Sequence, residues 1–151
     1  MSKLFVVGNP IKHSKSPIIH NYWLNKYSIK CIYETKKIDA SDLPNLVNSV
    51  RKGIIKGFNV TIPFKQVILE IVDEVDQNAK TSNAINTVYR KGNKVIGTNT
   101  DGLGFVRSLQ KDLKYPLSPR SNIFCIGAGG AAYGIISEIL KYEPNLIVIT
   151  N

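Results

Sequence analysis

Cysteine and histidine are scarce in this sequence, which holds two of each among its 151 residues. Cys31 and Cys125 are far apart and follow no paired spacing. The sequence therefore predicts neither a disulfide framework nor a zinc site, and we expect no bound metal. Cys125 stands inside the apolar run Ile123–Ile126, which favours a buried thiol.

Long hydrophobic runs are also lacking, because no apolar stretch approaches the roughly 18 residues that a membrane span needs. The apolar stretch within residues 1–8 is too short for a signal peptide and is typical of a first β-strand. We therefore expect a cytoplasmic protein with no membrane partner.

Acidic residues are outnumbered, with 11 Asp and Glu against 20 Lys and Arg, for a net charge of +9. The lysines are scattered, and aromatic residues do not alternate with them as stacking platforms for bases would. This pattern argues against a nucleic-acid partner, although a basic surface would help to attract a small anion. A hydrophobic content of 43% is typical of a globular protein with a real core.

Strand and helix patterns alternate along the first hundred residues, which indicates an α/β fold. Ser16 and Pro17 suit the N-cap and first position of a helix with one apolar face. Further helices are expected from Asp42 and after Pro63. The strands are predicted at residues 4–8, 32–38, 55–61, 85–90 and 94–99.

The tripeptide Lys91-Gly92-Asn93 predicts a hairpin, so the strand at 94–99 should give one antiparallel pairing in a mostly parallel sheet. We expect residues 1–101 to form a three-layer α/β domain. Residues 102–151 should hold a connecting helix, a proline-containing linker at 114–121, and one βαβ unit. Such a unit leaves sheet edges and one face uncovered, so it should be the beginning of a Rossmann-type domain that is truncated here.

The turn of this βαβ unit fits the dinucleotide pattern G-x-G-x-x-A, as Gly127-Ala128-Gly129-Gly130-Ala131-Ala132. Its glycines permit a tight turn and close approach of a pyrophosphate, and amides at the helix start attract the phosphate charge. The alternative is a glycine-rich packing contact without a ligand. The second strand ends in Thr150-Asn151 without the Asp or Glu typical of NAD sites, which favours NADP.

Four polar clusters are expected at the carboxyl ends of strands, where open α/β sheets bind ligands. Each cluster alone could be a helix cap, a turn or a solvated surface. Together, the hydroxyls of Ser14 and Ser16 suit a carboxylate, and a polyol would suit Asn59, Thr61 and Asn86. Lys65 and Asp101 would form an ammonium–carboxylate pair that transfers a proton to or from a hydroxyl.

These residues carry a family resemblance. The chain resembles the shikimate dehydrogenases in five motifs, in order and with matching spacing over all 151 residues. The motifs are Val7-Gly8-Asn9-Pro10-Ile11-x-His13-Ser14-x-Ser16-Pro17, Asn59-Val60-Thr61-Ile62-Pro63-Phe64-Lys65, Ala84-Ile85-Asn86-Thr87, Asn99-Thr100-Asp101-Gly102 and Gly127-Ala128-Gly129-Gly130-Ala131.

The resemblance implies NADPH-dependent, reversible reduction of 3-dehydroshikimate to shikimate in aromatic amino-acid biosynthesis, by a monomer or homodimer. It implies that two serines hold the substrate carboxylate and that Lys65 is the acid/base, with Asp101 as its partner. Ring hydroxyls would be bound by Asn59, Thr61, Asn86 and Asp101. NADP would be bound by Gly127, Ala128, Gly129, Gly130, Ala131 and Asn151.

Two departures from the family matter. Asn83 stands where the family often has glycine, and a left-handed backbone accepts either residue. Asn151 aligns with the first residue of the family's Asn-Arg cofactor motif, and the family's later residues are absent. The alternatives are a fragment that binds substrate without turnover and a quinate/shikimate variant. A folate-linked methylene dehydrogenase is a third, although that family lacks the Ser-x-Ser-Pro clamp.

Overall fold

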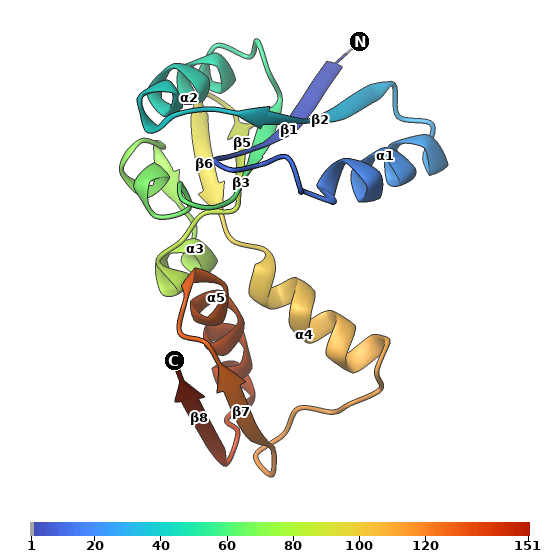
Figure 1. The fold of residues 1–151 in the computed structure, drawn as a ribbon, viewed down its shortest axis with the longest axis vertical. Helices are drawn as coiled ribbons and strands as arrows, with labels where there is room; N and C mark the ends of the chain where they lie inside the picture. The colour runs from blue at the N-terminus through green and yellow to red at the C-terminus, as the bar shows by residue number, and fades with distance from the viewer. Residues whose placement is uncertain (1) are drawn as a thin grey trace. The chain divides into compact units, whose positions relative to one another are not determined.

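The computed structural model describes residues 2–151, which separate into two compact units (Figure 1). The first unit runs to Val75 and resumes at Ile85–Thr98. The second consists of Asp76–Ala84 and Asn99–Asn151. None of the helices in residues 2–151 has the length and apolar character that a bilayer crossing requires.

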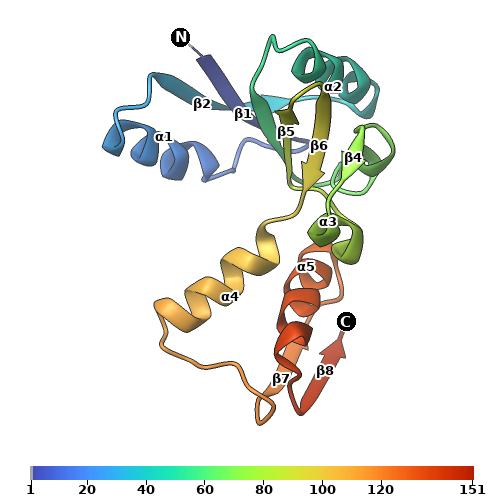
Figure 2. The same cartoon turned by 180° about the vertical axis from the view of Figure 1, so that it is seen from behind.

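The first unit is built on one mixed sheet, whose strand order is β2-β1-β3-β5-β6-β4. Its helices are α1 (Ser16–Lys26) and α2 (Leu43–Arg51), with short 3₁₀ turns at Ala40–Asp42 and Val67–Glu70. The strands are β1 (Ser2–Gly8), β2 (Cys31–Lys37), β3 (Gly57–Val60), β4 (Glu74–Val75), β5 (Thr87–Lys91) and β6 (Lys94–Thr98). Figure 2 shows β4 beside β6 at one edge of this sheet.

The sheet is mostly parallel, as expected, but β5 runs antiparallel to both of its neighbours. The sequence predicted a single antiparallel pairing, from the hairpin, and this was wrong. Val60 at the end of β3 donates its N–H to the carbonyl of Asn86, just before β5 (2.8 Å). The chain thus leaves β3 and enters β5 at the same edge of the sheet, which reverses the strand direction. The hairpin itself is confirmed, with Gly92 in its turn at φ +60°.

The apolar face expected on the first helix is exposed, with Ile18 67% and Trp23 41% accessible. Leu24 is the buried residue of α1, packed with Val6 and Tyr33. The helix lies along the outer strand, because the Asn21 side chain donates to Tyr33 O (2.8 Å) and accepts from Tyr33 N (2.9 Å). These two bonds satisfy backbone groups on an edge strand, a role that apolar periodicity does not predict.

One local prediction needs correction, and another, the left-handed Asn83, is confirmed. The segment after Pro63 forms a turn and then the 3₁₀ helix Val67–Glu70, in place of the expected helix starting at Phe64 and Lys65. Phe64 is buried, so this segment is anchored by a side chain without forming a regular helix. Asn83 follows helix α3 (Gln77–Ser82) with φ 48° and ψ 37°, the left-handed conformation that explains how Asn replaces glycine there.

The second unit contains one parallel strand pair and the helices around it. Its elements are α3 (Gln77–Ser82), α4 (Asp101–Lys111), β7 (Asn122–Ile126), α5 (Gly130–Ile139), a 3₁₀ turn (Leu140–Tyr142) and β8 (Leu146–Thr150). Helix α5 packs against both α3 and α4. The expected linker at 114–121 has no helix or strand, yet Leu117 is buried with Val106 and Ile139. This segment is therefore a packed connection.

The β7–β8 pair leaves apolar side chains uncovered, as expected for a lone βαβ unit. Phe124 is 65% and Ile126 82% exposed, and Val148 and Ile149 are exposed as well. Cys125 is only partly buried, contrary to the sequence-based prediction, because β7 has a strand neighbour on one side alone. Its thiol lies 3.4 Å from the carbonyl of Gly127.

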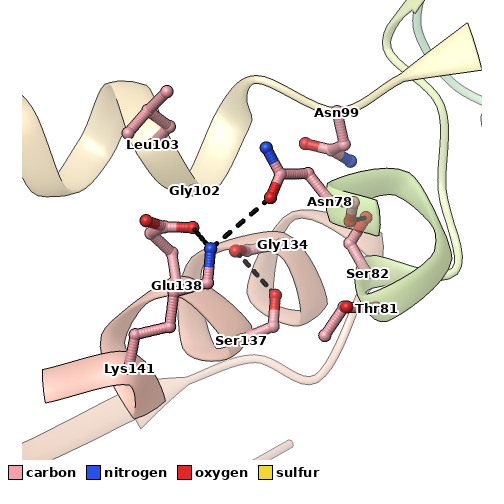
Figure 3. Close-up of a pocket in the computed structure, with 10 residues that line it drawn as sticks. All are labelled: Asn78, Thr81, Ser82, Asn99, Gly102, Leu103, Gly134, Ser137, Glu138 and Lys141. Atoms are coloured by element: carbon pink, nitrogen blue, oxygen red, sulfur yellow. Dashed lines mark hydrogen bonds and ion pairs between the residues drawn. The ribbon is translucent and has the colours of Figure 1, made fainter. Parts of the chain in front are cut away.

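Helices α4 and α5 approach closely through two glycines (Figure 3). A Cβ on Gly102 would lie 2.0 Å from the carbonyl oxygen of Gly134 and 2.9 Å from Cβ of Glu138. Beside this contact, Lys141 of the following 3₁₀ turn pairs with Glu138 and reaches Asn78 of α3 (3.4 Å). Residue 102 must therefore lack a side chain for the helices to meet.

We predict that Gly102→Ala lowers the free energy of unfolding by about 1–3 kcal/mol, the usual cost of overpacking. Gly104 is the matched control, because it lies in the same helix with nothing within 4 Å of an added Cβ. Gly104→Ala should stabilise the protein by about 0.5–1 kcal/mol through helix propensity. Urea unfolding measures both variants. Equal stability of the two would refute the close-packing argument.

Candidate active site

The predicted carboxylate clamp lies in the loop after β1 and at the start of α1. Ser14 and Ser16 are both partly buried, and the N–H of Ser16 donates to Oγ of Ser14 (3.3 Å). The helix begins at Ser16 itself, and Lys15 holds the N-cap position that was predicted for Ser16. The two serines are thus placed together by a local hydrogen bond at the start of a helix.

The loop after β1 is joined to the loop after β3 by backbone hydrogen bonds. Thr61 N donates to Val7 O (2.9 Å), and Asn9 N donates to Ile62 O (3.1 Å). A Cβ on Gly8 would lie 2.6 Å from Cγ2 of Thr61, so glycine permits this approach. The segments that carry the serines and Thr61 therefore meet at the carboxyl ends of β1 and β3.

The third polar cluster, Asn86 and Thr87, lies at the same end of the sheet, but for a reason that the sequence did not predict. Asn86 and Thr87 were expected at the carboxyl end of a strand, but they stand at the amino end of β5. Because β5 is antiparallel to β3, its amino end lies beside the carboxyl end of β3. Ile85 N also donates to Lys65 O (2.7 Å), which ties the Lys65 loop to this point.

Asn59 is held by three neighbours. Its Oδ1 accepts from the hydroxyl of Tyr33 (2.6 Å), and its Nδ2 donates to Thr87 Oγ1 (2.9 Å) and Asn86 O (3.2 Å). Thr87 Oγ1 in turn donates to Asn86 Oδ1 (2.8 Å). Asn86 is itself buried, with 8% of its surface exposed. The predicted amides of Asn59 and Asn86 are therefore both held by hydrogen bonds.

Tyr33 and Thr87 were not among the predicted site residues. Thr87 belongs to a motif that the sequence analysis quoted, but only its neighbour Asn86 received a role. Tyr33 is 26 positions from Asn59 in the sequence and belongs to no motif. The available signal was chemical, because a buried tyrosine in a strand needs a partner for its hydroxyl.

The predicted acid/base pair is divided between the two units. Lys65 is a partly buried residue of the first unit, in the turn after β3. Asp101 belongs to the second unit as the first residue of α4, and its N–H donates to Oδ1 of Asn99 (2.9 Å). Asn99 is buried and donates to Ala84 O (2.9 Å), so the start of α4 is well anchored. Convergence of Lys65 and Asp101 on one oxygen stays a prediction.

The glycine-rich turn has the geometry that a phosphate-binding loop needs. Gly127 has φ +106°, which L-residues with side chains rarely adopt, and its N–H donates to Thr150 O at the end of β8 (2.7 Å). Gly129 is the N-cap of α5, and neither it nor Gly130 has an atom within 4 Å of an added Cβ. The space before the helix start is open, and the first turn carries no acidic residue. These features fit a pyrophosphate.

A cavity of about 340 Å³ lies beside this turn, within the second unit. It is lined by Ala128 and Ala132 of the glycine-rich segment and by Ile149 of β8, among others. Ala131 is exposed on the first turn of α5, and Asn151 is exposed just after β8. Within residues 2–151, no group of three or more His, Cys, Asp or Glu side chains is arranged to hold a metal ion.

Known proteins share this sequence and fold. The chain is 42% identical to the NADP⁺ shikimate dehydrogenase of Pelagibacter ubique, covering 100% of this chain and 57% of that protein. It is 44% identical to the Bacillus subtilis enzyme of the same name, covering 100% and 54%. The chain thus spans about half the length of these curated relatives.

Solved structures agree with this result. A shikimate dehydrogenase crystallised with NADP⁺ superposes with a TM-score of 0.89 at 33% identity, over 100% of this chain and 51% of that one. The Thermus thermophilus enzyme in complex with shikimate gives 0.88 at 29% identity, over 100% and 57%. The family model described as shikimate dehydrogenase substrate binding domain matches residues 6–88, more than half of the 151 residues. The chain therefore belongs to the shikimate dehydrogenase substrate-binding domain family.

Proposed function

We propose that this chain provides the shikimate-binding domain and the first nucleotide-binding turn of an NADP-dependent shikimate dehydrogenase. The observation that carries the proposal is the meeting of three loops at one sheet edge through backbone hydrogen bonds. The first loop bears the serine pair, the second continues the Asn59–Lys65 motif from the end of β3, and the third bears Asn86. Relatives over the full chain are named for this activity.

The substrate-binding domain is proposed as residues 1–101 and the start of the cofactor domain as residues 102–151. In the first, Ser14 and Ser16 would hold the carboxylate of the substrate with their hydroxyls. Ring hydroxyls would be bound by Asn59, Thr61, Asn86 and Asp101. The positively charged chain would favour the arrival of this anionic substrate.

Lys65 is proposed as the acid/base. During reduction of 3-dehydroshikimate, its ammonium would give a proton to the C3 carbonyl oxygen as the carbon becomes tetrahedral. During oxidation of shikimate, its neutral amine would take that proton back. Asp101 would orient the ammonium and stabilise its charge.

NADPH, when bound, would supply the hydride that the C3 carbon receives. Residues 127–131 would hold its pyrophosphate, because the turn offers free space and a helix start without acidic residues. Asn151, after β8, would stand at the end of the strand where Rossmann folds recognise the ribose. The absence of an acidic residue there suits a 2′-phosphate, and thus NADP.

A second candidate function is substrate binding without turnover. The observation that favours it is the exposure of the apolar faces of β7 and β8 in the cofactor unit. An assay of the 151-residue chain with shikimate and NADP⁺, followed by NADPH absorbance, decides between the two. Measurable turnover would exclude the binding-only function, and binding without turnover would establish it.

We predict that Ser14→Ala or Ser16→Ala weakens shikimate binding by roughly 10- to 100-fold. A hydrogen bond to a charged group contributes about 1.5–3 kcal/mol, which sets this range. Ser49→Ala is the control, because its hydroxyl donates to Asn45 O within α2. Titration calorimetry on the 151-residue chain measures all three variants. Unchanged affinity in both clamp variants would remove the serines from the site.

We predict that Lys65→Ala lowers kcat by about 10²- to 10⁴-fold in an active enzyme that contains this sequence, the usual contribution of a positioned acid/base. The exposed Lys52, at the end of α2, is the control, and Lys52→Ala should leave kcat unchanged. Steady-state kinetics with shikimate and NADP⁺ provides the test. A kcat within a few-fold of the parent enzyme would rule out the assigned role.

A further inference from the structure

We infer that Tyr33 and Thr87 are positioning residues that fix the amide orientation of Asn59 and Asn86, so that Asn59 meets a ring hydroxyl as a hydrogen-bond acceptor only. The inference rests on the proposed function, because it concerns how those two amides select shikimate. It adds two residues to which the sequence analysis gave no role, and it specifies that Asn59 acts as an acceptor toward the substrate.

The register of the sheet places the three side chains on one face. Tyr33 of β2 pairs with Leu4 of β1, and Asn59 of β3 pairs with Val6 of β1. Leu4 and Val6 are two residues apart in one strand, so their side chains share a face. Asn59 also pairs directly with Thr87 of β5. Tyr33, Asn59 and Thr87 thus form a row across four adjacent strands.

The carbonyl of Asn86 decides the orientation of the Asn59 amide. This carbonyl oxygen lies 3.2 Å from the Asn59 side chain and can only accept hydrogen bonds. The Asn59 NH₂ group must therefore face it, because the opposite orientation would bring two carbonyl oxygens together. Oδ1 then faces the Tyr33 hydroxyl, which lies 2.6 Å away and donates its one hydrogen.

Tyr33 is well suited to this task. Its side chain is 3% exposed, and its ring stacks on His20 at a centroid distance of 4.1 Å. The side chain of Asn21 bonds to both backbone groups of Tyr33, which fixes the residue at its Cα. Burial raises the pKa of the Tyr33 phenol above its ordinary value, so the hydroxyl keeps its proton at neutral pH.

Thr87 fixes the orientation of the second amide, that of Asn86, by donating a hydrogen bond to it. Its Oγ1 accepts from Asn59 Nδ2 (2.9 Å), so its own hydrogen is directed to Asn86 Oδ1 at 2.8 Å. A hydroxyl both accepts and donates, which a valine side chain of the same shape does not do. The donor direction therefore runs from Tyr33 to Asn59, from Asn59 to Thr87, and from Thr87 to Asn86.

This arrangement limits what Asn59 offers a ligand. An amide NH₂ has two hydrogens, and here they face Asn86 O and Thr87 Oγ1. Oδ1 has two lone pairs, of which one receives the Tyr33 hydrogen. The remaining lone pair can accept a hydrogen from a ring hydroxyl. A ligand with no hydroxyl at that ring position gains nothing there, so Asn59 selects for a donor.

The test compares two ligands on the 151-residue chain by titration calorimetry. Shikimate has both the carboxylate and the ring hydroxyls, whereas cyclohexene-1-carboxylate has the carboxylate alone. The quantity measured is the ratio of the two affinities. Tyr33→Phe and Thr87→Val each remove one hydroxyl from the row, and we expect each to reduce this ratio about 2- to 12-fold, the effect of one net hydrogen bond. Affinity for cyclohexene-1-carboxylate should not change.

Two control variants make the result specific. Thr87→Ser keeps the hydroxyl and should retain the ratio of the parent chain. Tyr89→Phe removes a hydroxyl from β5 that lies outside the row, and it should also leave the ratio unchanged. A separate readout in the free protein is the side-chain amide NMR signal of Asn59. We expect it to shift and broaden in Tyr33→Phe, because the amide loses the bond that holds Oδ1.

The outcomes separate this inference from the proposed function. If the parent chain prefers shikimate and both Tyr33→Phe and Thr87→Val keep that preference, the positioning role is wrong while the proposed function stands. If Tyr33→Phe or Thr87→Val loses affinity for shikimate and for cyclohexene-1-carboxylate equally, the role is merely structural and the inference is overturned. The same conclusion follows if either variant is unfolded and Thr87→Ser also loses the preference for shikimate. If the parent chain shows no preference for shikimate, the proposed function fails and the inference fails with it.

Discussion

The carboxyl ends of β1 and β3 and the amino end of β5 are held together by backbone hydrogen bonds, from Thr61 to Val7 and from Val60 to Asn86. The loops that bear the predicted substrate residues of the first unit all leave the sheet at this edge. The antiparallel direction of β5 is what brings Asn86 there, because a parallel strand would place its first residue at the opposite edge. Strand direction thus determines which side chains can act together.

The need of polar side chains for hydrogen-bond partners adds a second constraint at this end of the sheet. Asn86 is buried and Asn59 is partly buried, and a buried amide without partners is costly. The hydroxyls of Tyr33 and Thr87 meet this requirement, and in doing so they remove the freedom of the amides to rotate. The bonds that stabilise the sheet face therefore also determine what the site presents to a ligand.

Glycines serve two different physical purposes in the second unit. Gly127 is required by its backbone conformation, with φ +106°, at the turn into α5. Gly102 has ordinary helical geometry and is required by the carbonyl of Gly134, which occupies the place of a Cβ. The motif Asn99-Thr100-Asp101-Gly102 thus combines a charged residue with a packing residue. The packing residue, Gly102, positions helix α4, which carries the charged residue, Asp101.

Local patterns predicted several elements well. The hairpin around Gly92, the strand–turn–helix at Gly127 and the left-handed Asn83 all depend on residues close in sequence, whose conformational preferences act locally. Two predictions failed for a shared reason, the buried Cys125 and the regular helix after Pro63. The partial exposure of Cys125 and the short 3₁₀ helix, like the exposure of the apolar face of α1, depend on what lies beside each segment. Periodicity carries no information on that.

The sequence by itself determined the fold class, the five motifs and the residue types of a carboxylate and polyol site, because these are properties of short segments. Only the tertiary structure decided that β5 runs antiparallel and that Tyr33 supports Asn59. Tyr33 and Asn59 are 26 positions apart and meet across an intervening strand. Their contact depends on the register of three strands, which long-range hydrogen bonding sets and no local pattern records.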